Sequence, residues 1–189
     1  MYRGIVIYIS IIINSTMAIN INDTIIKKFS TVDFSLPQLS FNGEYIGKTT
    51  ESLVYDGDTF KCLLFPLNGT EHNDIIKLNI RLSGIDTPEI RSKDLNEKKV
   101  ALIAKAKLIS LLNDCDYLHI EITGIDKYGG RYDSIVTQVK AVRDDITYEK
   151  SNITVNELIV QAGLAYKYDG GTKLSFNEWC DISKFINNE

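Results

Sequence analysis

Three short polar segments hold the side chains of this sequence that could do chemistry: residues 56–59, 81–89 and 126–131. The middle segment, Arg-Leu-Ser-Gly-Ile-Asp-Thr-Pro-Glu, brings one arginine, two carboxylates and a hydroxyl together. Carboxylates bind hard metal ions and act as general bases, and arginine suits a phosphate because its planar guanidinium donates two parallel hydrogen bonds. Each segment alone is also an ordinary turn, since Asp, Thr, Gly and Pro are common in turns.

The residues that lead into the middle segment alternate between apolar and polar, which predicts a strand. Residues 76–82 place apolar side chains at every second position, with lysine, asparagine and arginine between them. A period of two is typical of a half-buried strand, and it predicts Arg81 on the face away from the core. Pro88 restricts Thr87 to an extended or turn conformation. The carboxylates on either side of this pair therefore leave the strand end on a bent, stiffened backbone.

Five strands are predicted from the same patterning, at residues 44–55, 59–67, 74–82, 117–123 and 132–139. Asp56-Gly57, between the first two, is typical of a hairpin turn, because glycine supplies the positive φ that such a turn requires. Residues 140–152 carry many charges, and we expect them to form a loop to which no role can be assigned.

Three helices are predicted, at residues 94–112, 154–163 and 175–186. Each begins with Asp, Thr or Ser followed three positions later by Glu, which is the pattern of a capping box. The order of elements is therefore three strands, one helix, two strands and two helices. Five short strands with a helix after the third are compatible with a small, partly open barrel of the oligonucleotide-binding type.

Composition narrows the classes of function. With 189 residues, of which 44% are hydrophobic, the chain is long enough for one globular domain with a sizeable core. The net charge of −4 gives no support for broad attraction to nucleic acid, so any phosphate binding must come from local clusters. The three cysteines are widely spaced, which indicates neither a zinc site nor a disulfide framework. His72 and His119 lie in no metal-binding spacing, which argues against histidine-centred nuclease or protease chemistry.

The amino terminus has two interpretations. An apolar run at residues 4–13 follows Arg3 and precedes small residues, so residues 1–18 resemble a signal peptide with a short apolar region, too short for a comfortable transmembrane helix. Alternatively, Met17 is the true start and the residues before it are an upstream extension. The first interpretation predicts a secreted or membrane-targeted protein and the second an intracellular one, and the sequence leaves both open.

In this order and spacing, the motifs Tyr-Asp-Gly-Asp-Thr, Arg-Leu-Ser-Gly-Ile-Asp-Thr-Pro-Glu and Asp-Lys-Tyr-Gly-Gly-Arg resemble those of the staphylococcal nuclease (thermonuclease) family. The residues 155–158 and 163–165 match the second helix of that family. The resemblance implies an α+β, mainly β fold, a five-stranded oligonucleotide-binding barrel with three helices. We accordingly expect an N-terminal lead-in at 1–43 and a nuclease-like domain at 44–189.

The resemblance also implies an activity, that of a Ca²⁺-dependent phosphodiesterase cutting DNA and RNA as an endo- or exonuclease. By position, Asp58 and Asp86 correspond to the side-chain ligands of Ca²⁺, and Thr87 corresponds to a ligand through its backbone carbonyl. Glu89 corresponds to the residue beside the attacking water, as general base or as its orienter. We expect nucleic acid, preferably single-stranded, as the substrate of a monomer with no obligate protein partner.

The same carry-over assigns the substrate contacts. It implies that Arg81 and Arg131 bind the scissile phosphate. It also implies that further residues contact the phosphate and the nucleotide, namely Lys127, Tyr128 and either Tyr166 or Tyr168. Two glycines precede Arg131 where the family usually has one.

Two other classes of function remain as alternatives. One is a non-catalytic barrel that binds single-stranded nucleic acid or a protein, and the other is a structural domain stabilised by Ca²⁺. A binding module needs no complete set of acidic and basic groups, and a structural domain does not explain the arginines. The simultaneous presence of Asp58, Asp86, Glu89, Arg81 and Arg131 therefore favours the enzyme.

Overall fold

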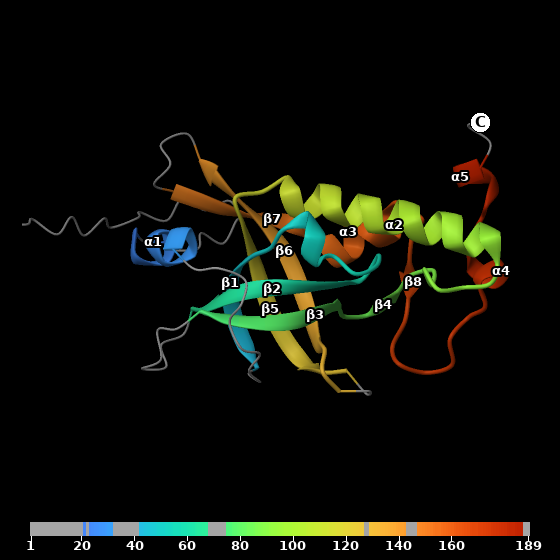
Figure 1. The fold of residues 1–189 in the computed structure, drawn as a ribbon, viewed down its shortest axis with the longest axis horizontal. Helices are drawn as coiled ribbons and strands as arrows, with labels where there is room; N and C mark the ends of the chain where they lie inside the picture. The colour runs from blue at the N-terminus through green and yellow to red at the C-terminus, as the bar shows by residue number, and fades with distance from the viewer. Residues whose placement is uncertain are drawn as a thin grey trace, which may run out of the picture.

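The structure, a computed structural model, describes residues 21, 23–31, 42–67, 75–126, 129–142 and 147–186. Its centre is a five-stranded mixed barrel, as the family resemblance implied, and the barrel is closed rather than partly open (Figure 1). The barrel strands follow the order β3-β2-β1-β5-β6, and β3 also pairs with β6. Their bounds are β1 Gly43–Lys48, β2 Thr59–Pro66, β3 Ile76–Leu82, β5 Tyr117–Ile125 and β6 Tyr132–Val142.

The pairing that closes the barrel also brings two distant segments together. β3 runs parallel to β6, and Arg81 lies opposite Asp133 in the register. The other barrel pairings are antiparallel. Because β6 begins just after Arg131, closure places that arginine beside the end of β3. The fold therefore determines that the second and third polar segments meet.

Three further strands lie outside the barrel. β4 Ile85–Asp86 pairs with β8 Tyr166–Lys167 as a separate two-stranded sheet. β7 Thr147–Thr154 extends the barrel sheet by pairing with the second half of β6. The prediction of a charged loop at residues 140–152 is therefore wrong. Only Tyr148 is buried along β7, so the strand has no alternation of apolar and polar residues by which the sequence could reveal it.

The described part of the chain contains five α-helices rather than the three predicted: α1 Asp23–Thr31, α2 Leu95–Asn113, α3 Val155–Gln161, α4 Phe176–Trp179 and α5 Ser183–Ile186. A short 3-10 helix, η1 Glu51–Leu53, replaces the end of the predicted first strand. The last predicted helix is divided because Cys180 is extended and the Asp181 side chain accepts hydrogen bonds from Ser183. Such local side-chain bonds compete with helix continuation.

Apolar side chains are buried in two clusters. The larger fills the barrel and the space under α2, α3 and the C-terminal helices, with Phe60, Leu78 and Ile120 fully buried. The smaller lies under α1, where Ile25 and Phe29 pack with Tyr117 and other side chains. Figure 1 places α1 at one end of the elongated molecule and α4 and α5 at the other. The middle polar segment, which contains β4, lies toward the second end, beside β8 (Figure 1).

The N-terminal alternatives concern residues 1–18, which are outside the described residues. The division between residues 43 and 44 stays a prediction, although α1, from the lead-in, packs on the barrel sheet. In the part of the chain that the structure describes, no helix is both long enough and apolar enough to cross a membrane.

Candidate functional site

Asp58 is the first of the predicted site residues along the chain, and a tight turn between η1 and β2 positions it. The backbone N–H groups of Tyr55 and Asp56 donate to the carbonyl of Thr59, which closes the turn. The Asp58 carboxylate is 3% exposed and accepts a hydrogen bond from the Thr59 hydroxyl at 2.8 Å. Burial, with a smaller contribution from repulsion by Asp56, raises the pKa of Asp58 to about 7. This carboxylate therefore favours a nearby cation.

Gly57 is required in that turn for a different reason from the one predicted. It does not adopt a positive φ. A Cβ at this position would lie 2.8 Å from the Cβ of Ala104 on α2 and 3.1 Å from the side chain of Thr87. Glycine is therefore needed because the turn that carries Asp58 presses directly against α2 and the segment after β4.

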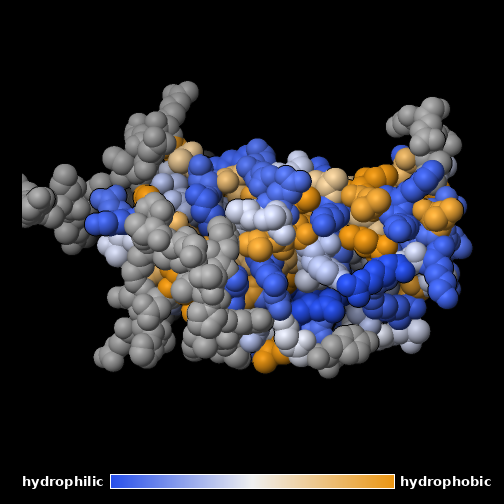
Figure 2. Space-filling view, viewed as in Figure 1, coloured by the Kyte–Doolittle hydropathy of each residue, from blue (hydrophilic) through white to orange (hydrophobic). Residues whose placement is uncertain are grey.

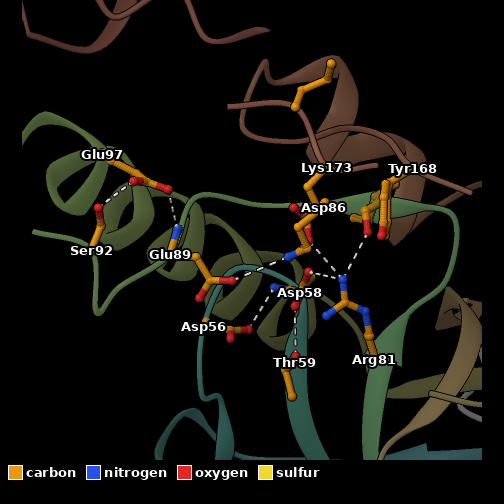
Figure 3. Close-up of polar contacts among 12 residues, drawn as sticks. Asp56, Asp58, Thr59, Arg81, Asp86, Glu89, Ser92, Glu97, Tyr168 and Lys173 are labelled. Atoms are coloured by element: carbon orange, nitrogen blue, oxygen red, sulfur yellow. Dashed lines mark hydrogen bonds and ion pairs between the residues drawn. The ribbon is translucent and has the colours of Figure 1, made fainter. Parts of the chain in front are cut away.

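Arg81 joins the first two polar segments. Its Nη2 atom lies 3.3 Å from Asp58 Oδ2 and 3.0 Å from Asp86 Oδ1, as Figure 3 shows. Although the strand pattern placed Arg81 away from the core, neighbouring segments leave its side chain only 15% exposed. Burial alone lowers the pKa of Arg81, but attraction by the two carboxylates outweighs burial and holds that pKa above its ordinary value. One guanidinium thus neutralises part of a buried pair of carboxylates.

Glu89 stands apart from this buried group, because its side chain is 64% exposed. Its backbone is nevertheless fixed, since its N–H donates to Glu97 Oε1 at 3.2 Å. Glu97 also accepts a hydrogen bond from the Ser92 hydroxyl, visible in Figure 3. The predicted capping box at the start of α2 is therefore only half formed. Asp94 caps the helix by accepting from two backbone N–H groups, but Glu97 holds the Glu89 segment instead of the cap.

Lys173 belongs to the site and was not predicted. Its Nζ atom lies 2.8 Å from Asp86 Oδ1 and 3.5 Å from Glu89 Oε1. The loop after β8 carries it there, because β8 pairs with β4, the strand that contains Asp86. The Tyr166 hydroxyl also donates to Asp86 Oδ2, at 3.3 Å. A two-residue strand leaves no periodic signal, so the hydrophobic pattern of the sequence could not indicate this residue.

Arg131 follows the double glycine. Both Gly129 and Gly130 have positive φ values, of 74° and 76°, which a residue with a side chain rarely adopts. The Arg131 side chain is partly exposed, and its Nε lies 3.9 Å from the buried Asp126. The predicted substrate contacts Lys127 and Tyr128 lie outside the described residues.

The second and third segments and the loop after β8 enclose a hollow of about 410 Å³. Arg81, Glu89 and Arg131 line it from the barrel side, and Tyr168 and Lys173 line it from the C-terminal loop. Tyr168 donates its backbone N–H to Gly84 and so is attached to the barrel end. Figure 2 shows hydrophilic side chains gathered below α2 near β4 and β8. The site is therefore an open, charged hollow rather than an apolar pocket.

Of the predicted site residues, the structure brings four close together: Asp58, Asp86, Arg81 and, directly after Asp86, the buried Thr87. Lys173 links the predicted Glu89 to this group. A second group borders the same hollow, namely Arg131 and Tyr168. Among the described residues there is no group of three or more His, Cys, Asp or Glu side chains arranged to hold a metal ion. A metal here would need backbone or water oxygens besides the two carboxylates.

Comparison with known proteins agrees with this arrangement. The family model described as staphylococcal nuclease homologue matches residues 79–179, just over half of the chain. The matched region contains every residue of the hollow, although it begins after Asp58. A search of curated proteins finds no match. The chain belongs to the staphylococcal nuclease family.

Proposed function

We propose that this protein is a Ca²⁺-dependent nuclease that hydrolyses phosphodiester bonds in DNA and RNA. The observation that carries the proposal is the contact of one guanidinium with two buried carboxylates. Arg81 lies 3.3 Å from Asp58 and 3.0 Å from Asp86, beside an exposed Glu89 and a second arginine. Family membership supports a role in nucleic-acid chemistry.

The donor set fits a hard cation. Asp58 and Asp86 are almost fully buried, and they share only partial compensation from Arg81 and Lys173. Ca²⁺ takes six to eight oxygen ligands in flexible geometry, so two carboxylates and the Thr87 carbonyl leave room for waters and a phosphate oxygen. When bound, the ion would neutralise charge on the phosphate and lower the pKa of a bound water.

Side chains of the protein would bind the phosphate and position the attacking water. Arg81 and Arg131 would donate hydrogen bonds to the phosphate oxygens, where a preorganised donor stabilises the transition state by about 2.7–4 kcal/mol. Glu89 would orient the attacking water or accept its proton, an effect worth about 10²–10⁴-fold. Its exposed carboxylate can reach a water in the hollow, and its backbone N–H is held by Glu97, which suits this role.

The binding-module alternative is less well supported. A barrel that only holds a single strand needs cations and aromatic side chains along its groove. Three carboxylates, those of Asp58, Asp86 and Glu89, would repel a phosphate backbone unless a cation intervened. Two of them are also buried, which costs stability without improving affinity for nucleic acid.

The test is hydrolysis of heat-denatured DNA and of RNA, with Ca²⁺ and then with a chelator. Cleavage at mildly alkaline pH should require Ca²⁺ and should be much weaker with Mg²⁺ alone, because Mg²⁺ demands stricter octahedral geometry. Glu89→Gln should lose about 10²-fold or more. Glu149→Gln, an exposed glutamate on β7, is the matched control and should cut at the wild-type rate. Absence of cleavage with Ca²⁺, or full activity of Glu89→Gln, would contradict the proposal.

A further inference from the structure

An exposed aromatic ring stands next to the catalytic turn and has no part in the proposed chemistry. Tyr55 is 53% exposed, although it directly precedes the turn that carries Asp58. The guanidinium of Arg91 lies over its ring, with the carbon 5.6 Å from the ring centre. An exposed tyrosine beside a cation is a surface to which a flat, π-bonded group binds well.

Two further hollows adjoin Tyr55, and one of them also adjoins the main hollow. A hollow of about 180 Å³ is lined by Tyr55 and Arg91 and also by Arg81, Glu89 and Arg131, the three residues that it shares with the main hollow. A third hollow, of about 410 Å³, lies beyond it and shares Tyr55 and Arg131 with the second. The three hollows therefore adjoin one another, and Arg131 borders all of them.

The outer hollow combines apolar and polar side chains. The hollow backs onto the core at the buried Val54 and Phe60, while Lys61 and Asn79 place a cation and an amide at its edge. An aromatic face with a nearby cation is the combination by which proteins hold a base and its phosphate without reading sequence. A small apolar ligand would not need the lysine or the arginine.

We propose that the outer hollow, lined by Val54, Tyr55, Phe60, Lys61 and Asn79, binds one nucleotide of a single strand. This nucleotide is on the opposite side of the scissile phosphate from the nucleotide bordered by Tyr168 and Lys173. Its base stacks on Tyr55, and Lys61 pairs with its phosphate. The inference rests on the proposed nuclease function, because Arg131, which borders every hollow, is the assigned phosphate contact. A nucleic-acid strand whose scissile phosphate lies at Arg131 continues on both sides of that phosphate, and one side faces the outer hollow.

The test measures binding without cleavage. Single-stranded DNA of two and of six nucleotides is titrated into the protein in chelator at low salt, with fluorescence anisotropy as the readout. Affinity of the hexamer should fall about tenfold in Tyr55→Ala, the scale of one lost stacking contact, and should be retained in Tyr55→Phe. Lys61→Met should reduce the same affinity by less. The dinucleotide should bind equally to all variants, and Leu102→Ala, another exposed apolar side chain, is the control.

A second readout locates the base. Hexamers with 2-aminopurine at successive positions should show quenching at one position in the wild type, and Tyr55→Ala should abolish it. Unchanged hexamer affinity in both Tyr55→Ala and Lys61→Met would overturn the subsite. That result would leave Ca²⁺-dependent cleavage by the wild type, and hence the proposed function, intact. Conversely, quenching that depends on Tyr55 in a protein that cuts nothing would refute the nuclease and keep the subsite. Lys61→Met also keeps the test decisive if Tyr55→Ala lowers the melting temperature.

Discussion

The two ends of the molecule (Figure 1) bury different kinds of side chain. Under α1, Phe29 packs on Tyr117 with ring centres 5.7 Å apart, and Tyr117 packs on Tyr148 at 5.6 Å. At the opposite end, Arg81 lies between the buried carboxylates Asp58 and Asp86. Burying rings stabilises a fold, whereas burying like charges destabilises it unless they are paired. We infer that the apolar end contributes mainly to stability and the charged end to the proposed hydrolysis. Mutations at the two ends should therefore separate stability from activity.

Arg81→Ala should have the largest effect, because it acts on both properties at the charged end. Turnover should fall about 10²–10³-fold with the loss of one preorganised donor. Removal of one partner from a buried ion pair costs about 3–5 kcal/mol, so the metal-free protein should also unfold more easily. Hydrolysis assays and urea denaturation, with and without Ca²⁺, measure these effects. Arg81→Lys keeps the charge, so it should recover stability more than activity. Equal recovery of both would contradict the comparison.

Phe29→Ala tests the apolar end. Removal of a buried phenylalanine ring typically costs about 3–5 kcal/mol, although α1 can shift to fill part of the space, which favours the lower value. Below the melting temperature, the rate of hydrolysis should stay that of the wild type. Urea denaturation and the nuclease assay at 25 °C measure the two quantities. A loss of activity without unfolding would show that the ends are coupled.

Lys173→Met should separate the role of the metal from that of the lysine. The ammonium of Lys173 lies 2.8 Å from Asp86, so its removal should destabilise the metal-free protein by about 1 kcal/mol, the scale of a partly exposed ion pair. Since the lysine and the proposed Ca²⁺ share a carboxylate, Ca²⁺ should bind several-fold more tightly in the variant. Calorimetric titration with Ca²⁺ measures this, and Lys167→Met on β8 is the control. Weaker Ca²⁺ binding in Lys173→Met would exclude competition.

His119 gives the smallest effect, and it lies away from the charged end. Burial, together with the charge of Lys150, lowers the pKa of His119 below its ordinary 6.5, while Glu44 opposes them. The unfolded chain therefore binds this proton more readily than the folded one, so stability should fall as pH drops below 6.5. The melting temperature of His119→Gln should change less between pH 7.5 and 5.5 than that of the wild type. Parallel curves would show that His119 contributes nothing to the pH dependence.

The barrel and most of the site could be predicted because both depend on strong local signals. Period-two patterning gave the five barrel strands, and the three polar segments gave the residues that now surround Arg81. Lys173 could not be predicted, because its place depends on a two-residue strand pairing with a segment far away in sequence. Glu97 was misassigned for a similar reason. Its pattern fits a helix cap, but the nearby Glu89 amide and Ser92 hydroxyl compete for the same carboxylate.

Gly57 has a consequence for the proposed Ca²⁺ site. The absence of its Cβ lets the turn that carries Asp58 approach α2 at Ala104, with Thr87 on the other side. The distance between the carboxylates of Asp58 and Asp86 therefore depends on how closely α2 packs, because the turn that carries Asp58 contacts both Ala104 and Thr87. Changing Ala104 by a single methyl group would alter the size of the cation that fits without altering any oxygen. The ionic radius that the site prefers would then be a property of the hydrophobic core.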